Sequence, residues 1–261
     1  MRRLLPDPAP DLDDTALLES YAPPGSGDPF VRFNFISSID GAATLGGLSG
    51  DLGTDADKRV FMLLRRVADV ILVGAGTVRA EGYDGELLDA PSRAWRLERG
   101  MPERPLLAVV SGHLDLDPGS ELFTTNPGKI LLLTSGAADP ERAAALGAVA
   151  EVIASAEPGP AIDPRWIIRT LHGKGLRMIH SEGGPTLLGD FQRADAVDSL
   201  CVTFSPLLVG GDSRRIARGT PTDVSREMSL HLLLEEDSGL LAEYRRAHVS
   251  GPAGQTSIGN R

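Results

Sequence analysis

Val70-Ile-Leu-Val-Gly-Ala-Gly-Thr77 decides how this chain folds. A short run of large apolar residues enters a turn with two glycines, which is typical of a buried strand that passes into a helix. The same order returns where Arg177–Ser181 enters the turn Glu182-Gly-Gly-Pro185. In an open α/β sheet such turns lie at the carboxyl edge of the strands, where ligands bind. We therefore expect a ligand site at this edge.

Strands and helices alternate on both sides of this stretch. The first strand of the fold is predicted to begin at Phe30, because Val31, Phe33 and Phe35 alternate with polar residues. Thr54-Asp-Ala-Asp57 resembles a capping box and opens a helix. Further strands are predicted at 106–110, 129–134, 151–155, 177–181 and 197–204, and further helices from 139–140, 164 and 186. This order predicts an α/β fold with a mostly parallel sheet and helices on both faces.

The two ends of the chain depart from this alternation. Residues 1–29 are rich in Pro, Asp and Gly and are predicted to form an N-terminal arm with a short helix around Thr15–Tyr21. Near the other end, 229–235 and 240–249 predict an antiparallel hairpin, and 250–261 a polar tail. A single domain is expected over 30–249. The Arg- and Glu-rich stretch 81–104 could form a flap over the site.

Composition and charge argue against several classes of protein. The chain has 36 acidic and 26 basic residues, a net charge of −10, which disfavours a nucleic acid or an anionic membrane as the main partner. The single cysteine, Cys201, excludes an internal disulfide framework and a Cys-rich zinc site. Signatures of serine hydrolases, P-loop proteins, zinc proteases and zinc deaminases are missing. Neither a signal peptide nor a membrane span is evident, so we expect a cytoplasmic protein without a metal.

The two glycine turns suit a dinucleotide. Gly74-Ala-Gly76-Thr77 is not the Rossmann fingerprint, because Arg79 stands in place of the third glycine. In Gly183-Gly184-Pro185-Thr186 the glycine pair permits a positive φ and a close approach of the ligand, and the following helix directs N–H groups at the turn. Each turn alone could equally be a tight corner. Two on one sheet favour a dinucleotide.

Three charged side chains are candidates for substrate binding. Glu182, at a strand end, could accept paired N–H bonds from an aminopyrimidine or pterin edge, or it could be a helix N-terminal charge partner. Asp40 could contact the ligand or form an Asx-turn that closes the first strand. Arg65 could reach a substrate phosphate, although an exposed helix arginine is the commoner case.

Together these motifs resemble the reductase domain of riboflavin biosynthesis, the C-terminal half of the bifunctional pyrimidine deaminase/reductase, whose fold is similar to dihydrofolate reductase. The matching segments are Phe33-Asn-Phe-Ile-Ser-Ser-Ile-Asp-Gly41, Leu64-Arg65 with 68–78, 181–188, and Ser205-Pro-Leu-Leu-Val-Gly-Gly211. The chain also resembles a stand-alone actinobacterial branch of this family, with Arg-x-Glu-Gly-Tyr at 79–83.

This resemblance implies a cytoplasmic homodimer that uses NADPH to reduce 5-amino-6-(5-phosphoribosylamino)uracil, converting its opened ribose into a ribityl chain. The substrate contacts that we expect are Asp40, Arg65 and Glu182. The cofactor contacts that we expect are Ile36, Thr54, Gly74, Gly76, Thr77, Glu81, Ser111, Gly183, Gly184, Pro185, Thr186, Leu187 and Leu188. The catalytic residues are left unassigned.

The chain departs from the family pattern in the loop after the first strand. A basic residue that usually follows Asp-Gly is replaced by Ala42, and a Ser and a Trp are replaced by Gly50 and Leu52. Both changes concern the phosphoribosyl group, so the substrate stays open. A dihydrofolate or pterin reductase and a non-catalytic NADPH-binding protein are the alternatives. No acidic residue suited to a free ribose 2′-hydroxyl follows the first glycine turn, whereas Arg93 and Arg96 do, which favours NADPH over NADH.

Overall fold

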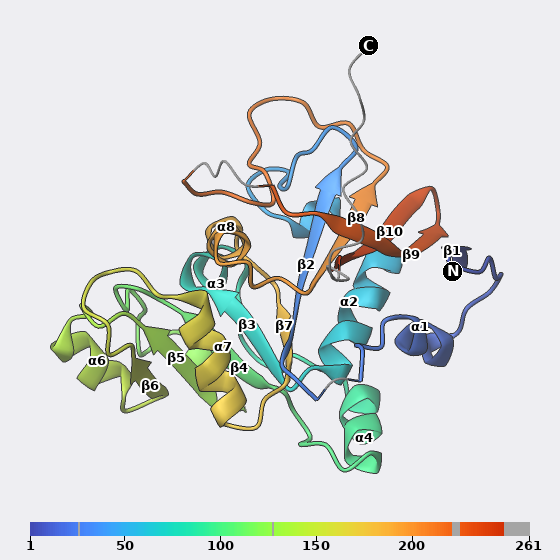
Figure 1. Cartoon of the computed structure of the whole chain (residues 1–261). Coiled ribbons are helices and arrows are strands. Elements are labelled where there is room, and N and C mark those ends of the chain that lie inside the picture. The colour runs from blue at the N-terminus through green and yellow to red at the C-terminus, as the bar shows by residue number, and fades with distance from the viewer. Residues whose placement is uncertain (26, 127, 221–224, 248–261) are drawn as a thin grey trace, which may run out of the picture.

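A computed structural model describes residues 1–247 except 26, 127 and 221–224. A ten-stranded sheet runs through it in the order β1-β9-β10-β8-β2-β7-β3-β4-β5-β6 (Figure 1). The strands are β1 (Arg2–Leu5), β2 (Phe30–Ser38), β3 (Val70–Gly74), β4 (Leu106–Val110), β5 (Ile130–Thr134), β6 (Glu151–Ala154), β7 (Met178–Ser181), β8 (Ser199–Ser205), β9 (Met228–Glu236) and β10 (Gly239–Arg246).

The strands from β8 to β6 in this order, which make up the larger part of the sheet, pair in parallel. β2 lies between β8 and β7, and β3 between β7 and β4, and all of these pairs are parallel. β10 pairs antiparallel with β8 and β9 at the other end. The predicted mostly parallel sheet with an antiparallel C-terminal hairpin is therefore confirmed, while positions 248 and 249 of that hairpin and the tail 250–261 lie outside the described residues.

The N-terminal segment contains a strand that the sequence analysis did not predict. β1 pairs antiparallel with β9 at residues 233–235 and forms the edge of the sheet. Only four residues separate Met1 from the turn that begins at Pro6, which is too short a run for alternation to stand out from the sequence. The helix predicted around Thr15–Tyr21 is confirmed as α1 (Asp14–Ser20).

Helices cover both faces of the sheet (Figure 1). α7 (Pro164–Gly173) and α8 (Pro185–Arg193) bury their apolar sides against the strands on one face, together with Phe33 and Leu72. The opposite face carries α1 and α2 (Asp55–Val67) over β8 to β10, and α3 (Ala75–Glu81) and α6 (Pro140–Leu146) farther along. The remaining helices are α4 (Ala90–Glu98), α5 (Glu121–Thr124) and a 3₁₀ turn at Gly50–Leu52. No helix in the described ranges is long and apolar enough to cross a bilayer.

Arg96 fixes α4 to the end of α2, so this part of 81–104 is not a flap. Its fully buried guanidinium donates hydrogen bonds to the carbonyl oxygens of Arg66 (2.8 Å), Ala68 (2.6 Å) and Pro102 (2.7 Å). The first two carbonyls belong to the C-terminal end of α2, where a positive charge is favourable. The expected flap over the site is wrong for α4.

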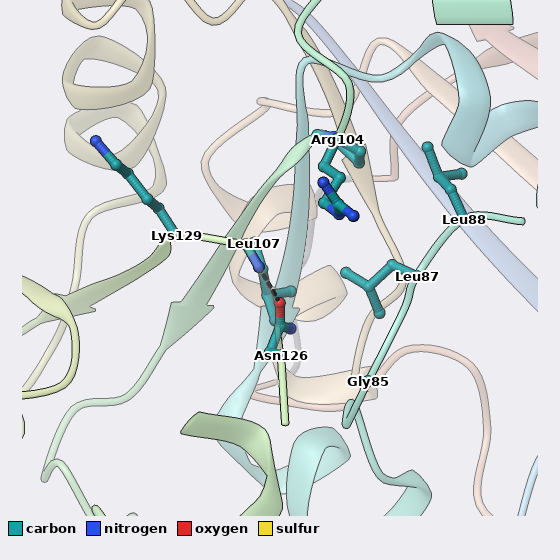
Figure 2. Close-up of a pocket in the computed structure, with 9 residues that line it drawn as sticks. Gly85, Leu87, Leu88, Arg104, Leu107, Asn126 and Lys129 are labelled. Atoms are coloured by element: carbon teal, nitrogen blue, oxygen red, sulfur yellow. Dashed lines mark hydrogen bonds between the residues drawn. The ribbon is translucent and has the colours of Figure 1, made fainter. Parts of the chain in front are cut away.

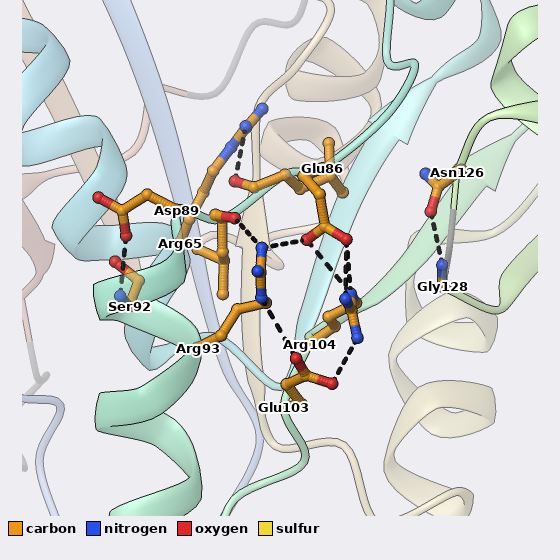
Figure 3. A network of polar contacts seen from close by, with 11 residues as sticks. Arg65, Glu86, Asp89, Ser92, Arg93, Glu103, Arg104, Asn126 and Gly128 are labelled. Carbon is orange, nitrogen blue, oxygen red and sulfur yellow. Dashed lines mark hydrogen bonds and ion pairs between the residues drawn. The ribbon is translucent and has the colours of Figure 1, made fainter.

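Four charged side chains hold the segments on either side of α4 (Figure 3). Arg93 lies between Glu86 (2.7 Å) and Glu103 (3.2 Å), and Arg104 contacts the same two carboxylates. The hydrogen bonds and charge of Arg104, with those of Arg93, outweigh the effect of desolvation and hold the pKa of Glu86 below its ordinary value. This cluster ties 86–104 to the outside of the fold, and residues 81–83 alone of this stretch line the large cavity described below.

Candidate functional site

A cavity of about 800 Å³ opens at the carboxyl edge of the parallel strands. The ends of β2, β3 and β4 and the first turns of α2, α3 and α8 contribute to its walls. Its volume suits a small-molecule ligand together with a cofactor. A second hollow beneath Leu87 and Leu88, against Leu107 of β4, measures only about 10 Å³ (Figure 2). That is room for about one water molecule, so the large cavity is the candidate site.

The two glycine turns meet at the edge of this cavity. The N–H of Gly74 donates a hydrogen bond to the carbonyl of Gly183 at 2.8 Å. Gly183 has a φ of +90°, and an added Cβ would lie 2.8 Å from the ring of Phe35. Gly184 has a φ of −84°, and there a Cβ would lie 2.5 Å from Oγ1 of Thr77. The positive φ expected of the glycine pair therefore belongs to Gly183, whereas Gly184 is required by close approach.

The helices that begin at these turns lack side-chain caps. α3 and α8 start from Gly74 and Gly184, neither of which has a side chain that could accept a hydrogen bond from the N–H groups of the first turn. The helices α1, α2, α4, α6 and α7 are instead capped by the side chains of Asp13, Thr54, Asp89, Asp139 and Asp163. The first turn of α8 thus presents N–H groups and its positive dipole end to the cavity, which is an environment that suits a phosphate.

Arg65 and Glu182, predicted as separate substrate contacts, form an ion pair with each other. Nε of Arg65 lies 2.6 Å from Oε1 of Glu182, and Nη2 lies 2.8 Å from Oε2. The hydroxyl of Tyr83 donates to the same Oε2 at 2.7 Å. Burial raises the pKa of the Glu182 carboxyl, but the charge and hydrogen bonds of Arg65 outweigh it and leave the pKa below its ordinary value. Both oxygens of this carboxylate are therefore already engaged.

Aromatic rings hold the guanidinium of Arg65 in place. It lies 4.3 Å from the ring centre of Phe61 and 5.7 Å from that of Tyr83. Nη1 also donates to the carbonyl of Leu87 at 3.1 Å, beside the charge cluster of Figure 3. The interpretation of Arg65 as an exposed helix arginine is wrong, because its side chain is only 13% exposed.

Asp40 lies outside the cavity lining and organises a loop instead. Its carboxylate accepts hydrogen bonds from Oγ of Ser38 (2.5 Å) and from the N–H groups of Gly210 (2.7 Å) and Val209 (3.2 Å). The bond from Ser38, followed by those from Gly210 and Val209, lowers the pKa of Asp40 to about 2. Asp40 therefore ties the loop after β8 to the end of β2, and its expected contact with substrate, which the cavity lining does not support, stays a prediction.

Three expected cofactor contacts are likewise absent from the cavity lining. The hydroxyl of Thr54 accepts a hydrogen bond from the N–H of Asp57 at 3.2 Å and caps α2. Gly183 faces Gly74, and Leu188 packs into the core beneath α8. The expected residues that do line the cavity are Ile36, Arg65, Gly74, Gly76, Thr77, Glu81, Ser111, Glu182, Gly184, Pro185, Thr186 and Leu187.

Several cavity residues were not predicted from the sequence. Asp57 and Phe61 line the wall on the same helix as Arg65, and Arg214 lines the opposite loop. Positions 57, 61 and 65 follow the i, i+4, i+8 spacing of one helix face. The sequence could therefore have predicted that Asp57 and Phe61 lie on the same side of α2 as Arg65. Glu81 accepts hydrogen bonds from the N–H and Oγ of Ser49, both at 2.9 Å, which joins α3 to the loop of residues 40–53.

His180 lies directly beneath the ion pair and is completely buried. Neither ring nitrogen has a hydrogen-bond partner among the described residues, and Nε2 lies 3.7 Å from Oε1 of Glu182. Burial lowers the pKa of His180 to about 4, with Glu182 opposing this and Arg32 and Arg65 adding to it. The folded protein therefore holds this imidazole neutral.

A His180→Phe variant is expected to lose part of the acid sensitivity of the fold. The folded pKa is depressed, so the unfolded state binds the proton first as pH falls from about 6.5 toward 4, and the wild type loses up to about 3 kcal/mol of unfolding free energy. Phe cannot titrate and suits the contact with Phe61. Urea unfolding at pH 7, 5.5 and 4.5 measures the difference, with exposed His172→Gln as the control. An unchanged pH slope in His180→Phe would refute this account.

The chain matches the sequence model of the RibD C-terminal domain over residues 29–238. It is 28% identical over 222 residues to a 2,5-diamino-6-ribosylamino-4(3H)-pyrimidinone 5′-phosphate reductase from Methanothermobacter thermautotrophicus, covering 83% of this chain and 97% of that one. It is 29% identical to the riboflavin biosynthesis protein RibD of Mycobacterium tuberculosis over 71% of this chain, which spans 44% of that longer protein. A solved pyrimidine reductase-like protein from Corynebacterium diphtheriae superposes with a TM-score of 0.76 at 28% identity, over 88% of this chain and 98% of that one. The expected dihydrofolate-reductase-like α/β fold is confirmed by these matches.

Proposed function

Because this chain belongs to the RibD C-terminal domain family, we propose that it reduces a ribosylaminopyrimidine 5′-phosphate with NADPH. Its relatives are reductases of riboflavin biosynthesis, so the chain is an oxidoreductase of that pathway. The observation that carries the proposal is the meeting of two uncapped, glycine-started helices at one large cavity. A cytoplasmic homodimer stays a prediction from the resemblance, and sedimentation and cell fractionation test it.

The cavity fits a nicotinamide dinucleotide, which the family implies. An added Cβ at Gly184 would meet Thr77, and the open first turn of α8 offers its N–H groups beside them. We assign Gly184–Leu187 and Thr77 to the pyrophosphate, Ile36 to the nicotinamide end and Ser111 to the adenosine end. When bound, the cofactor supplies the hydride, while the protein orients both ligands and excludes water.

Arg65 remains able to hold a substrate phosphate despite its ion pair. Three of its N–H groups are used by Glu182 and Leu87, and the guanidinium carries further N–H donors that these contacts leave free. Its planar guanidinium is held against the rings of Phe61 and Tyr83. In this proposal Glu182 positions Arg65 and does not bind the pyrimidine ring.

Selectivity for the 2′-phosphate of NADPH needs a different basic residue from those that the sequence suggested. Arg96 is buried against backbone carbonyls, Arg93 pairs with Glu86 and Glu103, and neither lines the cavity. Arg79 does line it and is half exposed, and its Nη1 donates to the carbonyl of Asp115 at 2.8 Å in the loop after β4. We assign the selectivity to Arg79.

Arg79→Ala is expected to weaken NADPH by about tenfold, the usual loss for a charge-assisted hydrogen bond, and to leave NADH nearly unchanged. The ratio of kcat/KM for the two cofactors measures this. Arg142→Ala, which removes an exposed arginine near the same Asp115, is the matched control. Equal efficiency of the wild type with NADPH and NADH would contradict the preference itself.

The decisive test of the function follows NADPH absorbance with three substrates offered separately. These are 2,5-diamino-6-ribosylamino-4(3H)-pyrimidinone 5′-phosphate, 5-amino-6-(5-phosphoribosylamino)uracil and dihydrofolate. Oxidation of NADPH with either ribosylaminopyrimidine is expected. Turnover of dihydrofolate alone would make the protein a pterin reductase, and tight NADPH binding without turnover of any of them would make it a non-catalytic binding protein.

A further inference from the structure

Asp57 is a cavity carboxyl that the other charged groups of the site leave available. Glu182 is engaged by Arg65 and Tyr83, and Glu81 by Ser49. Asp57 also lines the cavity, yet none of the ion pairs found within the described ranges includes it. Its neighbour Lys58 contacts Asp55 instead, at 3.8 Å. Apart from the hydroxyl of Thr203, no donor is recorded for this carboxyl within the described ranges, and a carboxylate has room to accept further N–H groups from a ligand.

The position of Asp57 suits the pyrimidine end of the proposed substrate. Asp57, Phe61 and Arg65 follow one another at i, i+4 and i+8 on α2, and all three line the same wall. At about 1.5 Å of rise per residue, Asp57 stands about 12 Å from Arg65 along the helix axis. A ribosylamino phosphate can span that separation, with its phosphate at Arg65 and its ring beyond Phe61.

The surroundings of Asp57 favour hydrogen bonding over free solvation. Burial raises the pKa of its carboxyl, against a hydrogen bond from the hydroxyl of Thr203 and the charge of Lys58, which lower it. Thr203 lies on β8 and is itself buried, so little water reaches this side of the carboxyl. A carboxylate held there gains most from two parallel N–H donors, because they replace the water that burial removes.

The two ribosylaminopyrimidines offered in the test of the proposed function differ at this chemistry. A 2-amino-4-oxopyrimidine presents its 2-amino group and its N3–H side by side, which are two donors for one carboxylate. A uracil presents a carbonyl oxygen at C2 next to N3–H, and that oxygen would repel the same carboxylate. One carboxyl can therefore distinguish the two rings.

Resting on the proposed function, we propose that Asp57 binds the 2-amino and N3–H groups of the pyrimidine, so the preferred substrate is the 2,5-diaminopyrimidinone and not the aminouracil. The product then still carries its 2-amino group. A hydrolytic deamination, in which water replaces that amino group and ammonia leaves, must therefore act after this reductase and not before it.

The test compares the wild type with Asp57→Asn on both pyrimidines. An asparagine offers one donor and one acceptor, which is the complement of the uracil edge and not of the diaminopyrimidinone edge. We expect Asp57→Asn to lose about ten- to a hundredfold in kcat/KM on the diaminopyrimidinone and to keep or improve its rate on the aminouracil. Asp55→Asn, which removes an exposed carboxylate from the same helix turn, should behave as the wild type on both.

NADPH binding, followed by thermal shift, checks that each variant is folded and is expected to be unchanged. Competition of the wild type by free 2-amino-4-oxopyrimidine and by uracil gives a second measure that needs no variant. Preference of the wild type for the aminouracil, or an equal loss on both substrates in Asp57→Asn, would overturn the assignment. If neither pyrimidine is turned over, the proposed function fails, and calorimetric binding of the diaminopyrimidinone then decides the role of Asp57: binding lost in Asp57→Asn supports it, and unchanged binding overturns it.

Discussion

Gly184→Val should abolish NADPH binding while leaving the protein folded. An added Cβ at this position already lies 2.5 Å from Oγ1 of Thr77, so the larger valine side chain must take the space beside the first turn of α8. The N–H groups there would lose their approach to the pyrophosphate, and each such bond to a charged group contributes about 1.5–3 kcal/mol. Two lost bonds correspond to at least a hundredfold in Kd. A thermal-shift titration with NADPH measures the loss.

Gly173→Val supplies the matched control for this substitution. Gly173 ends α7, and an added Cβ there meets nothing within 4 Å. It therefore tests the general cost of a valine in place of a helical glycine without affecting the cavity. Wild-type-like stabilisation of a folded Gly184→Val protein by NADPH would remove the α8 turn from the cofactor site.

Arg65→Leu is expected to produce the largest loss of stability among single substitutions in the site. It leaves the carboxylate of Glu182, whose side chain is only 2% exposed, without its charge partner. Breaking a buried ion pair from one side costs about 3–5 kcal/mol, which for a chain of this size is a fall in Tm on the order of 10 °C. Calorimetry at pH 7 measures it, and turnover should be lost as well.

The double variant Arg65→Leu/Glu182→Leu separates stability from activity. Replacing both charges by apolar side chains removes the unpaired carboxylate, so most of the lost stability should return. Activity should not return, because the phosphate contact of Arg65 is missing in either case. A double variant no more stable than Arg65→Leu would mean that Glu182 is not the source of the destabilisation.

The regular part of this fold was predictable because its signals are local. The buried run at Val70–Val73 and the glycine turns announce parallel strands that enter helices, and prolines mark the starts of α6, α7 and α8. β1 and α4 were missed for the opposite reason. Each is held by partners far away in sequence: β9 in the first case and the carbonyls at the end of α2 in the second.

The site, too, was predictable where local motifs place its residues and not where residues far apart in the sequence contact each other. The positions of the motifs in the sequence were enough to predict that Thr77, Ser111 and the turn before α8 lie at the cavity. It could not reveal that Arg65 and Glu182 pair with each other, since they lie 117 positions apart in the sequence. Nor could it show that the N–H of Gly210 donates a hydrogen bond to Asp40. The helical spacing of Asp57 and Arg65, in contrast, is present in the sequence and places both residues at the cavity.

The pairing of β1 with β9 has a consequence for the order in which this protein matures on the ribosome. Arg2 forms an ion pair with Glu235, a residue synthesised 233 positions later. β1 must therefore wait, unpaired, until β9 has emerged, and contacts of such long sequence separation form slowly. Until β1 pairs with it, β9 exposes the unpaired backbone N–H and C=O groups of an edge strand to other nascent chains. A tag fused ahead of Met1 would lie beside this late β1–β9 pairing. Aggregation during expression should therefore differ between a protein with an N-terminal tag and one with a C-terminal tag.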